Sequence, residues 1–209
     1  MRHGLIAAGI AGVFTASIVD PSFGAFVPVS ATRSLQIPAP VTQTGFGGFN
    51  FSRMASAGNS QAPFSVTIAQ NSNIGTDLST PMVSYFGSML FAGGGTSAQT
   101  IPVQNSFSLI FSLTSERTIQ HTFPTLAPQY FTASITPSAG PAVNLFSGGS
   151  NGQILPAGQY TLSIVGTGTA FSGNNSSSTL SGEISFVPAP LPGGVLLIGS
   201  LLGLRRRRK

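Results

Sequence analysis

The strongest constraint on the fold of this chain is an alternation of apolar and hydroxyl-bearing residues with a period of two. Successive side chains of a β-strand point to opposite faces of the sheet, so this pattern predicts strands that are buried on one side only. The positions between the apolar residues hold mostly Ser, Thr and Gln, which face solvent without charge. The best-defined apolar series comprise Phe64, Val66 and Ile68; Phe107, Leu109, Phe111 and Leu113; Phe131, Ala133 and Ile135; Tyr160, Leu162 and Ile164; and Ile184 and Phe186.

Clusters of Gly, Pro, Asn and Ser separate these segments and predict turns between them. Neither a sustained helical periodicity nor a repeat of fixed length is present, which argues against solenoids and propellers. The sequence therefore predicts an all-β body over residues 25–186, built as an antiparallel β-sandwich or a jelly roll. Within it, Ala25–Gln43 is expected to be an edge strand or a lead-in segment, and Ser172–Gly182 a long loop before the last strand.

Charge is scarce in the body and concentrated at the ends of the chain. The sequence has nine basic and four acidic residues, and charged residues make up only 6% of it. Arg2 and the run Arg205–Lys209 lie outside the body, whose own charges balance: Arg33, Arg53 and Arg117 against Asp77, Glu116 and Glu183. A nucleic-acid-binding protein needs several clustered cations to neutralise phosphates, so nucleic acid is not an expected partner. The adjacent Glu116 and Arg117 are expected to be turn or surface charges.

The first 24 residues have the organisation of an export signal. Arg2 precedes an apolar stretch from Gly4 to Val19, and the small residues Ser22 and Gly24 follow it. This order predicts a secretory signal peptide over residues 1–24, formed as a short helix and handled by the Sec export machinery. The alternatives are a buried N-terminal helix and an uncleaved anchor. Several glycines make the stretch a poor helix, and its length is marginal for a full span.

The C-terminal end combines prolines, a short apolar run and a cluster of cations. Leu191–Leu204 is apolar apart from Ser200 and would extend roughly 21 Å as a helix, less than the ~30 Å hydrocarbon core of a bilayer. Cations favour the cytoplasmic side of a membrane, and their long side chains reach the headgroups around a short span. We therefore expect a short transmembrane helix with the body outside and five residues inside: Arg205, Arg206, Arg207, Arg208 and Lys209. A solvated or DNA-binding tail is the alternative, and it leaves the apolar run unexplained.

This three-part tail, residues 187–209, resembles the PEP-CTERM sorting signals of Gram-negative bacteria, in particular the variant typified by Val-Pro-Leu-Pro-Ala. The family's central Glu is absent, and the resemblance is carried by Val187, Pro188, Ala189, Pro190, Leu191 and Pro192. It implies that an exosortase, a membrane-embedded transpeptidase-like enzyme, recognises and processes the tail. It also implies an exported protein that is held in the inner membrane and then reaches the cell surface or an exopolysaccharide biofilm matrix.

The body offers few groups for catalysis or for binding a metal or cofactor. Cysteine is absent, Lys209 is the only lysine, and His121 is the only histidine after the leader. Thiol, Schiff-base and His-rich zinc chemistry are therefore excluded from the body. His121 could be the base of a Ser–His pair, but an ordinary strand or surface histidine is the simpler interpretation. The glycine-rich stretches at 92–97 and 166–173 do not match nucleotide-binding fingerprints, and Asp77 lacks the spacing of a calcium loop. We expect no cofactor.

Two hypotheses of different classes follow for the body. The first is a non-catalytic surface or matrix protein whose neutral, hydroxyl-rich faces adhere to exopolysaccharide or to neighbouring copies, because low net charge favours association. Tyr85, Tyr130 or Tyr160 would then supply a stacking platform for sugars. The second is a secreted hydrolase that acts on matrix polysaccharide through His121 and the three carboxylates of the body. The shortage of catalytic groups favours the first hypothesis.

Overall fold

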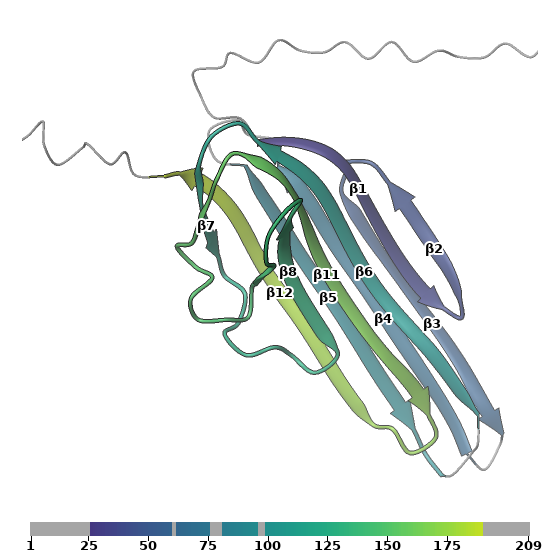
Figure 1. The fold of residues 1–209 in the computed structure, drawn as a ribbon. Coiled ribbons are helices and arrows are strands. Elements are labelled where there is room, and N and C mark those ends of the chain that lie inside the picture. The colour runs from purple at the N-terminus through teal and green to yellow at the C-terminus, as the bar shows by residue number, and fades with distance from the viewer. Residues whose placement is uncertain (1–25, 60–61, 76–80, 96–98, 190–209) are drawn as a thin grey trace, which may run out of the picture.

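The computed structural model describes residues 26–59, 62–75, 81–95 and 99–189. This part of the chain is all-β and forms two antiparallel sheets of six strands each (Figure 1). Sheet A has the order β2-β1-β6-β11-β8-β9 and consists of β1 (Phe26–Ile37), β2 (Ala39–Thr44), β6 (Thr100–Leu113), β8 (Phe131–Pro137), β9 (Val143–Asn144) and β11 (Gly158–Phe171). Sheet B has the order β10-β7-β12-β5-β4-β3 and consists of β3 (Phe49–Asn59), β4 (Ala62–Gly75), β5 (Met82–Gly93), β7 (Arg117–His121), β10 (Ile154–Leu155) and β12 (Ser176–Pro188).

The predicted alternation is confirmed, because the residues of all five apolar series lie in strands and are buried. In β6 every second residue from Val103 to Leu113 is buried, and the residues between them are partly exposed. The all-β body predicted from the sequence is therefore correct. The helices predicted for residues 1–24 and for the C-terminal tail lie outside the described residues.

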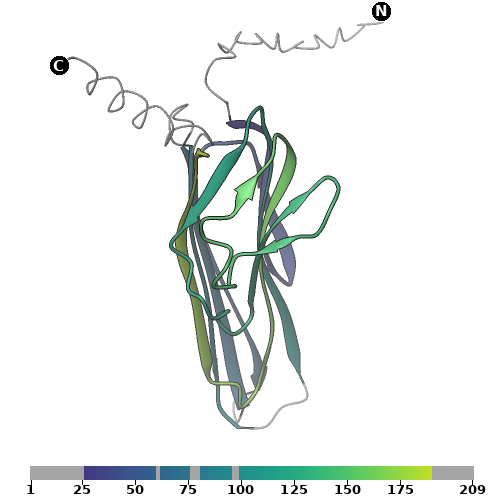
Figure 2. The same cartoon turned by 60° about the vertical axis from the view of Figure 1, so that its left-hand side comes forward.

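Aromatic rings connect the two sheets. Phe111 of β6 stacks against Phe26 of β1 and lies close to Phe186 of β12, with ring centroids 4.9 and 4.8 Å apart. Phe26 and Phe186 also stack on each other, at 5.1 Å. The start of β1 and the end of β12 thus meet in one core that both sheets share. Figure 2 shows the sheets as two layers of an elongated molecule.

The prediction of a long loop over Ser172–Gly182 is wrong, because β12 begins at Ser176. Two of its early residues point inward: Ser178 is buried and donates its hydroxyl to the Gln129 carbonyl, and Leu180 is 1% exposed. A run of serines has weak strand propensity on its own, and pairing with β5 overrides it. At the N-terminal side, β1 and β2 form a hairpin in which β2 is the edge strand.

A turn after β9 is tied to β7 and brings residues distant in sequence together. Gly152 donates its N–H to the Ile119 carbonyl at 2.8 Å, and Ile119 donates to the Gln153 carbonyl at 2.9 Å. Within the turn, Ser150 donates its N–H to the Ser147 carbonyl at 3.1 Å. These bonds hold the turn against the end of β7, where His121 lies.

The shared aromatic core predicts a specific stability difference. We expect Phe111→Ala to lower the free energy of unfolding by about 3–5 kcal/mol, because it removes a buried ring and leaves a cavity between the sheets. Phe171→Ala is the matched control, since this ring is 45% exposed, and its effect should stay within about 0.5 kcal/mol. Urea unfolding followed by circular dichroism measures both. Equal losses in the two variants would contradict the assignment of the core.

Candidate functional site

The structure does place His121 beside a serine. His121 ends β7, and its Nε2 lies 2.8 Å from the hydroxyl of Ser150. Ser150 is 1% exposed, and its hydroxyl also lies 2.7 Å from the Ser147 carbonyl, to which it donates. The hydroxyl therefore accepts from Nε2–H, which leaves Nδ1 as the unprotonated nitrogen. Nδ1 is buried and has no hydrogen-bond partner among the described residues.

This pair fastens a turn and lacks the geometry of an activated nucleophile. A catalytic serine needs an accessible oxygen and a base that is oriented by a third group. Ser150 is enclosed, its proton is directed at a backbone carbonyl, and the second imidazole nitrogen has no orienting acid. The arrangement instead clamps the turn after β9 onto β7.

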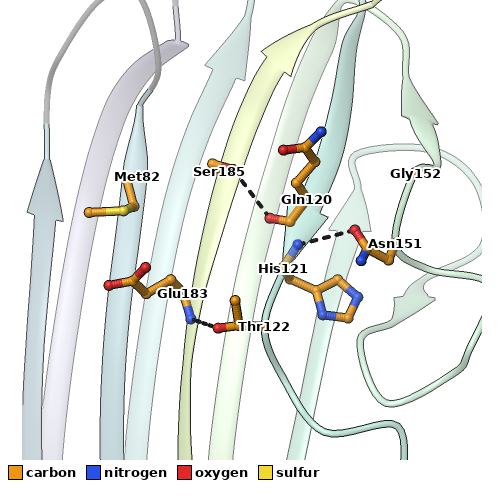
Figure 3. Close-up of a pocket in the computed structure, with 8 residues that line it drawn as sticks. All are labelled: Met82, Gln120, His121, Thr122, Asn151, Gly152, Glu183 and Ser185. Carbon is orange, nitrogen blue, oxygen red and sulfur yellow. Dashed lines mark hydrogen bonds between the residues drawn. The ribbon is translucent and has the colours of Figure 1, made fainter.

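The carboxylates predicted as possible catalytic partners are not gathered around His121. Glu183 is exposed on β12, and in Figure 3 its carboxylate points away from the imidazole ring. The backbone of Glu183, and not its side chain, pairs with Thr122 through two bonds of 2.9 and 3.0 Å. Glu116 is exposed just before β7, and Asp77 lies outside the described residues. No group of three or more His, Cys, Asp or Glu side chains that could hold a metal occurs within the described ranges.

An open depression of about 550 Å³ lies beside this clamp, on sheet B (Figure 3). It is lined by Met82, Gln120, His121, Thr122, Asn151, Gly152, Glu183 and Ser185. A neighbouring hollow of about 480 Å³ shares Thr122 and Glu183 with it. Six of these eight residues have polar or charged side chains, with Glu183 as the single acid, although more of the exposed lining surface is apolar than polar. The depression can therefore offer hydrogen bonds to a ligand but little charge.

The predicted sugar-stacking role is wrong for two of the three tyrosines. Tyr85 is 2% exposed and donates its hydroxyl to Asn105 Oδ1 at 3.1 Å, and burial raises its pKa above the ordinary value. Tyr160 is 5% exposed, stacks on Phe111 and donates to the Pro156 carbonyl at 2.7 Å. Tyr130 is half-buried and makes an edge contact with Phe91. A ring that could stack on a flat sugar must present its face to solvent, and the rings of Tyr85 and Tyr160 lie in the core.

Two of the three arginines of the body are also buried, which corrects the prediction that Arg117 is a turn or surface charge. Arg117 is 3% exposed, because it begins β7 on the same inward face as Ile119, and it donates to the Phe186 carbonyl at 3.3 Å. Arg33 is fully buried between Ala31 and Leu35 on the inner face of β1. It donates to Ser72 Oγ at 2.8 Å and to the Gly45 carbonyl at 2.5 Å. Burial lowers the pKa of both guanidinium groups.

The outward face of sheet A is consequently free of charge. Arg33 is the only charged residue in the strands of this sheet, and it points inward. Cross-strand pairing arranges the outward residues in rows, and residues directly opposite each other share a face. One row runs Thr44, Thr32, Ser108, Ser163, Ser134 and Asn144. The next runs Thr42, Ser34, Ser106, Val165 and Thr132. All of these residues except Val165 and Asn144 carry hydroxyls, and we name the two rows the hydroxyl face.

The hydroxyl face has a regular geometry. Neighbouring strands lie about 4.8 Å apart and alternate residues of one strand about 6.7 Å apart, so the side-chain oxygens stand on a grid with these spacings. The Thr42 hydroxyl donates to Ser34 Oγ at 3.3 Å, which illustrates the contact between neighbouring strands. The abundance of Ser and Thr is evident in the sequence but the rows are not, because the rows depend on the register of strands far apart in the chain.

The predicted sorting motif begins inside the folded body. Val187 and Pro188 are the last residues of β12 and lie opposite Thr118 and Arg117 of β7. Ala189 donates its N–H to the Glu116 carbonyl at 3.5 Å. The other predicted tail residues, Pro190, Leu191 and Pro192 together with Arg205–Lys209, lie outside the described residues.

Comparisons of the chain with models of protein families, with curated proteins and with solved structures gave no match. Within the described ranges there is no helix whose length and hydrophobicity would let it cross a bilayer. Functional inference for this chain therefore depends on the chemistry of its surfaces and of its tail.

The His121–Ser150 clamp predicts a pH-dependent stability. Burial lowers the pKa of His121 below its ordinary value of 6.5, so the unfolded chain binds a proton more readily than the folded one. The free energy of unfolding should then fall as the pH drops from 6.5 toward the lowered pKa of the folded state. It should have its full value at pH values well above 6.5, where the histidine is neutral in both states. In His121→Gln, an amide N–H can still reach Ser150 but does not titrate.

Urea midpoints measured between about pH 5 and about pH 8 test this prediction, in the range where histidine titrates and most carboxylates do not. The wild-type midpoint should decrease at the acidic end, and that of His121→Gln should change much less. Parallel pH profiles would show that another group is responsible.

Proposed function

We propose that this chain is an exported, non-catalytic surface or matrix protein. Its β-sandwich or jelly-roll-like body binds neutral polysaccharide through the hydroxyl face, and its tail is processed by an exosortase. The observation that carries the proposal is the charge-free array of hydroxyls on sheet A. Charged residues make up about 25% of a typical soluble domain, so a sheet of six strands whose one charge is buried requires a reason.

A neutral polysaccharide fits this face chemically. Serine and threonine hydroxyls both donate and accept hydrogen bonds, as sugar hydroxyls do, so the partners can pair in many relative positions. Short side chains such as Ser163 and Thr32 lose little rotamer freedom on binding. Without cations the face has no counterion-release contribution, which disfavours phosphate-bearing polymers. An extended polymer can cross several strands and so contact both rows at once.

The tail supports export and processing. Residues 1–24 have the order of a signal peptide, and Arg205–Lys209 follow an apolar run that suits a short span with its cations inside. Val187 and Pro188 pair with β7, and the Ala189 N–H donates to the Glu116 carbonyl, so the described part of the motif is hydrogen-bonded to the body. We therefore expect the processing enzyme to bind the motif after Ala189, where binding would not require β12 to unfold.

Binding to an insoluble neutral glucan tests the first part of the proposal. We expect the wild-type protein to sediment with microcrystalline cellulose, and the bound fraction to change little between low and high salt, because the face carries no charge. Ser163→Glu places a carboxylate in the middle of the hydroxyl face and should weaken binding at least about tenfold, which corresponds to ~1.4 kcal/mol. Ser88→Glu introduces the same charge on the outward side of sheet B and is the matched control.

Two results would contradict this use of the hydroxyl face. One is an equal loss of binding in Ser163→Glu and Ser88→Glu. The other is release of the wild-type protein by salt, which would indicate an electrostatic attachment through the terminal cations.

Intact-mass analysis of the protein from the medium, the cell surface and the membrane tests processing. We expect the mature form to lack residues 1–24 and Arg205–Lys209 and to end at Ala189 or at one of the next three residues. Replacing the five cations by Gln should leave the tail uncleaved, because the span loses its cytoplasmic anchor. Replacing Arg205–Arg208 by Lys keeps the charge and should keep processing. An extracellular form with an intact basic end argues against exosortase-type processing.

A further inference from the structure

The four edges of the two sheets differ in how well they are protected against pairing with another strand. Proteins usually shorten edge strands or place prolines or charges on them, since an edge exposes unpaired N–H and C=O groups. β9 and β10 are two residues long, and β2 contains Pro40 and follows Pro38. The remaining edge, β3, has 11 residues and no proline. Among the described strands it is the one long edge without these protections.

The single charge on β3 does not guard its free edge. Arg53 is partly buried and donates through Nη1 to the Ala39 carbonyl of β2 at 2.5 Å. It lies opposite Ile68 of β4, a fully buried residue, and therefore on the inner face of the sheet. The guanidinium is directed toward sheet A and not along the line of backbone groups that β3 exposes.

The backbone groups at the free edge can be assigned from one hydrogen bond. Gly58 donates its N–H to Gln99 Oε1 at 2.8 Å, so this N–H points away from β4. In an antiparallel pair, the residues whose N–H and C=O point outward alternate along the strand. The outward groups of β3 are therefore those of Asn50, Ser52, Met54 and Ser56. Within the described residues, no hydrogen bond is made to the outward backbone groups of these four residues, and Gly58 is the one outward residue of β3 that makes one.

We propose that two copies of this chain pair in antiparallel fashion along β3, with Met54 opposite Met54 of the second copy. This two-fold arrangement places Ser52 opposite Ser56 of the second copy and joins the two copies of sheet B into one continuous sheet. Pairing stops before Gly58, whose N–H is bound to Gln99. The interface is isologous, so both copies lose their exposed edge at once and the assembly closes as a dimer.

The side chains of β3 favour a second copy in this register. Met54 is 71% exposed, and pairing covers it with its own counterpart. On the inner face Arg53 then lies opposite Ala55 of the second copy. A shift by one residue along each strand would set Arg53 opposite Arg53, and like charges directly opposite destabilise a sheet. The predicted body carries three basic and three acidic residues, so two copies repel each other only weakly.

Pairing along β3 leaves sheet A uncovered. The dimer would then present two hydroxyl faces, and a polymer that contacts both is held more tightly than by one. The pairing itself does not require glycan binding, so the two proposals can fail independently.

Cysteine crosslinking tests the pairing directly, because the native chain has no cysteine. Opposite residues of a hydrogen-bonded pair have Cα atoms about 5.5 Å apart, which suits a disulfide. We expect most of a Met54→Cys full-length protein, purified in a nonionic detergent and mildly oxidised, to run as a disulfide-linked dimer. Met82→Cys is the matched control, since Met82 is also exposed on sheet B but lies on the interior strand β5. Its dimer fraction should be at least tenfold lower.

Two further variants test the register. A mixture of Ser52→Cys and Ser56→Cys proteins should form mixed dimers, whereas each alone should crosslink poorly, because a residue and its own counterpart would be four positions, or about 13 Å, apart. Equal crosslinking of Met54→Cys and Met82→Cys, or none at Met54, overturns the proposal and would point to association through the apolar tail or to a monomer. Self-crosslinking of Ser52→Cys in place of the mixed dimer overturns the register.

Discussion

Phe111 lies where the two sheets meet, with its ring against Phe26 and Tyr160 of sheet A and Phe186 of sheet B. The chain has no cysteine and few charges, so its stability must come mainly from apolar surface buried between the sheets. Burial of alternate residues also dictates that every other residue turns outward on a regular lattice. The hydroxyl face is therefore a direct consequence of the way the core is built. Only the positions of its residues follow from the core, and not their identity, because nothing in the burial of Phe107 requires its outward neighbours Ser106 and Ser108 to be serines.

Polar groups inside the core restrict which strand registers are possible. Asn105 accepts a hydrogen bond from Tyr85 and donates to the Ala69 carbonyl at 2.9 Å, and Arg33 donates to Ser72. Arg33 also lies 5.5 Å from the centre of the Phe107 ring, where the negative face of the ring stabilises the cation. A slip of β1 by one residue would turn Arg33 outward and break its bonds to β4 and to Gly45.

Local pattern predicted the strands whose inward residues are strongly apolar, such as those around Phe107 and Phe131. It missed the start of β12, where Ser178 points inward, and it placed Arg117 of β7 at a turn or on the surface, because polar residues are buried only when a partner from another strand is present. The His121–Ser150 contact joins residues 29 positions apart and depends on the turn after β9. The rows of the hydroxyl face and the free edge of β3 depend in the same way on register and strand order. Sequence indicated the kinds of residue at these places, and tertiary structure determined which of them meet.

The arrangement of the ends is consistent with the proposed attachment through the tail. Phe26 begins β1, Phe186 lies near the end of β12, and their rings are 5.1 Å apart, so the proposed signal and sorting segments both join the body at one end of the molecule. A body held there at a membrane, or linked there after processing, keeps the length of both sheets away from the attachment point. The hydroxyl face and the β3 edge belong to different sheets, so a polymer on sheet A and a second copy along β3 would not compete. Attachment, adhesion and pairing can therefore occur on one small domain at the same time.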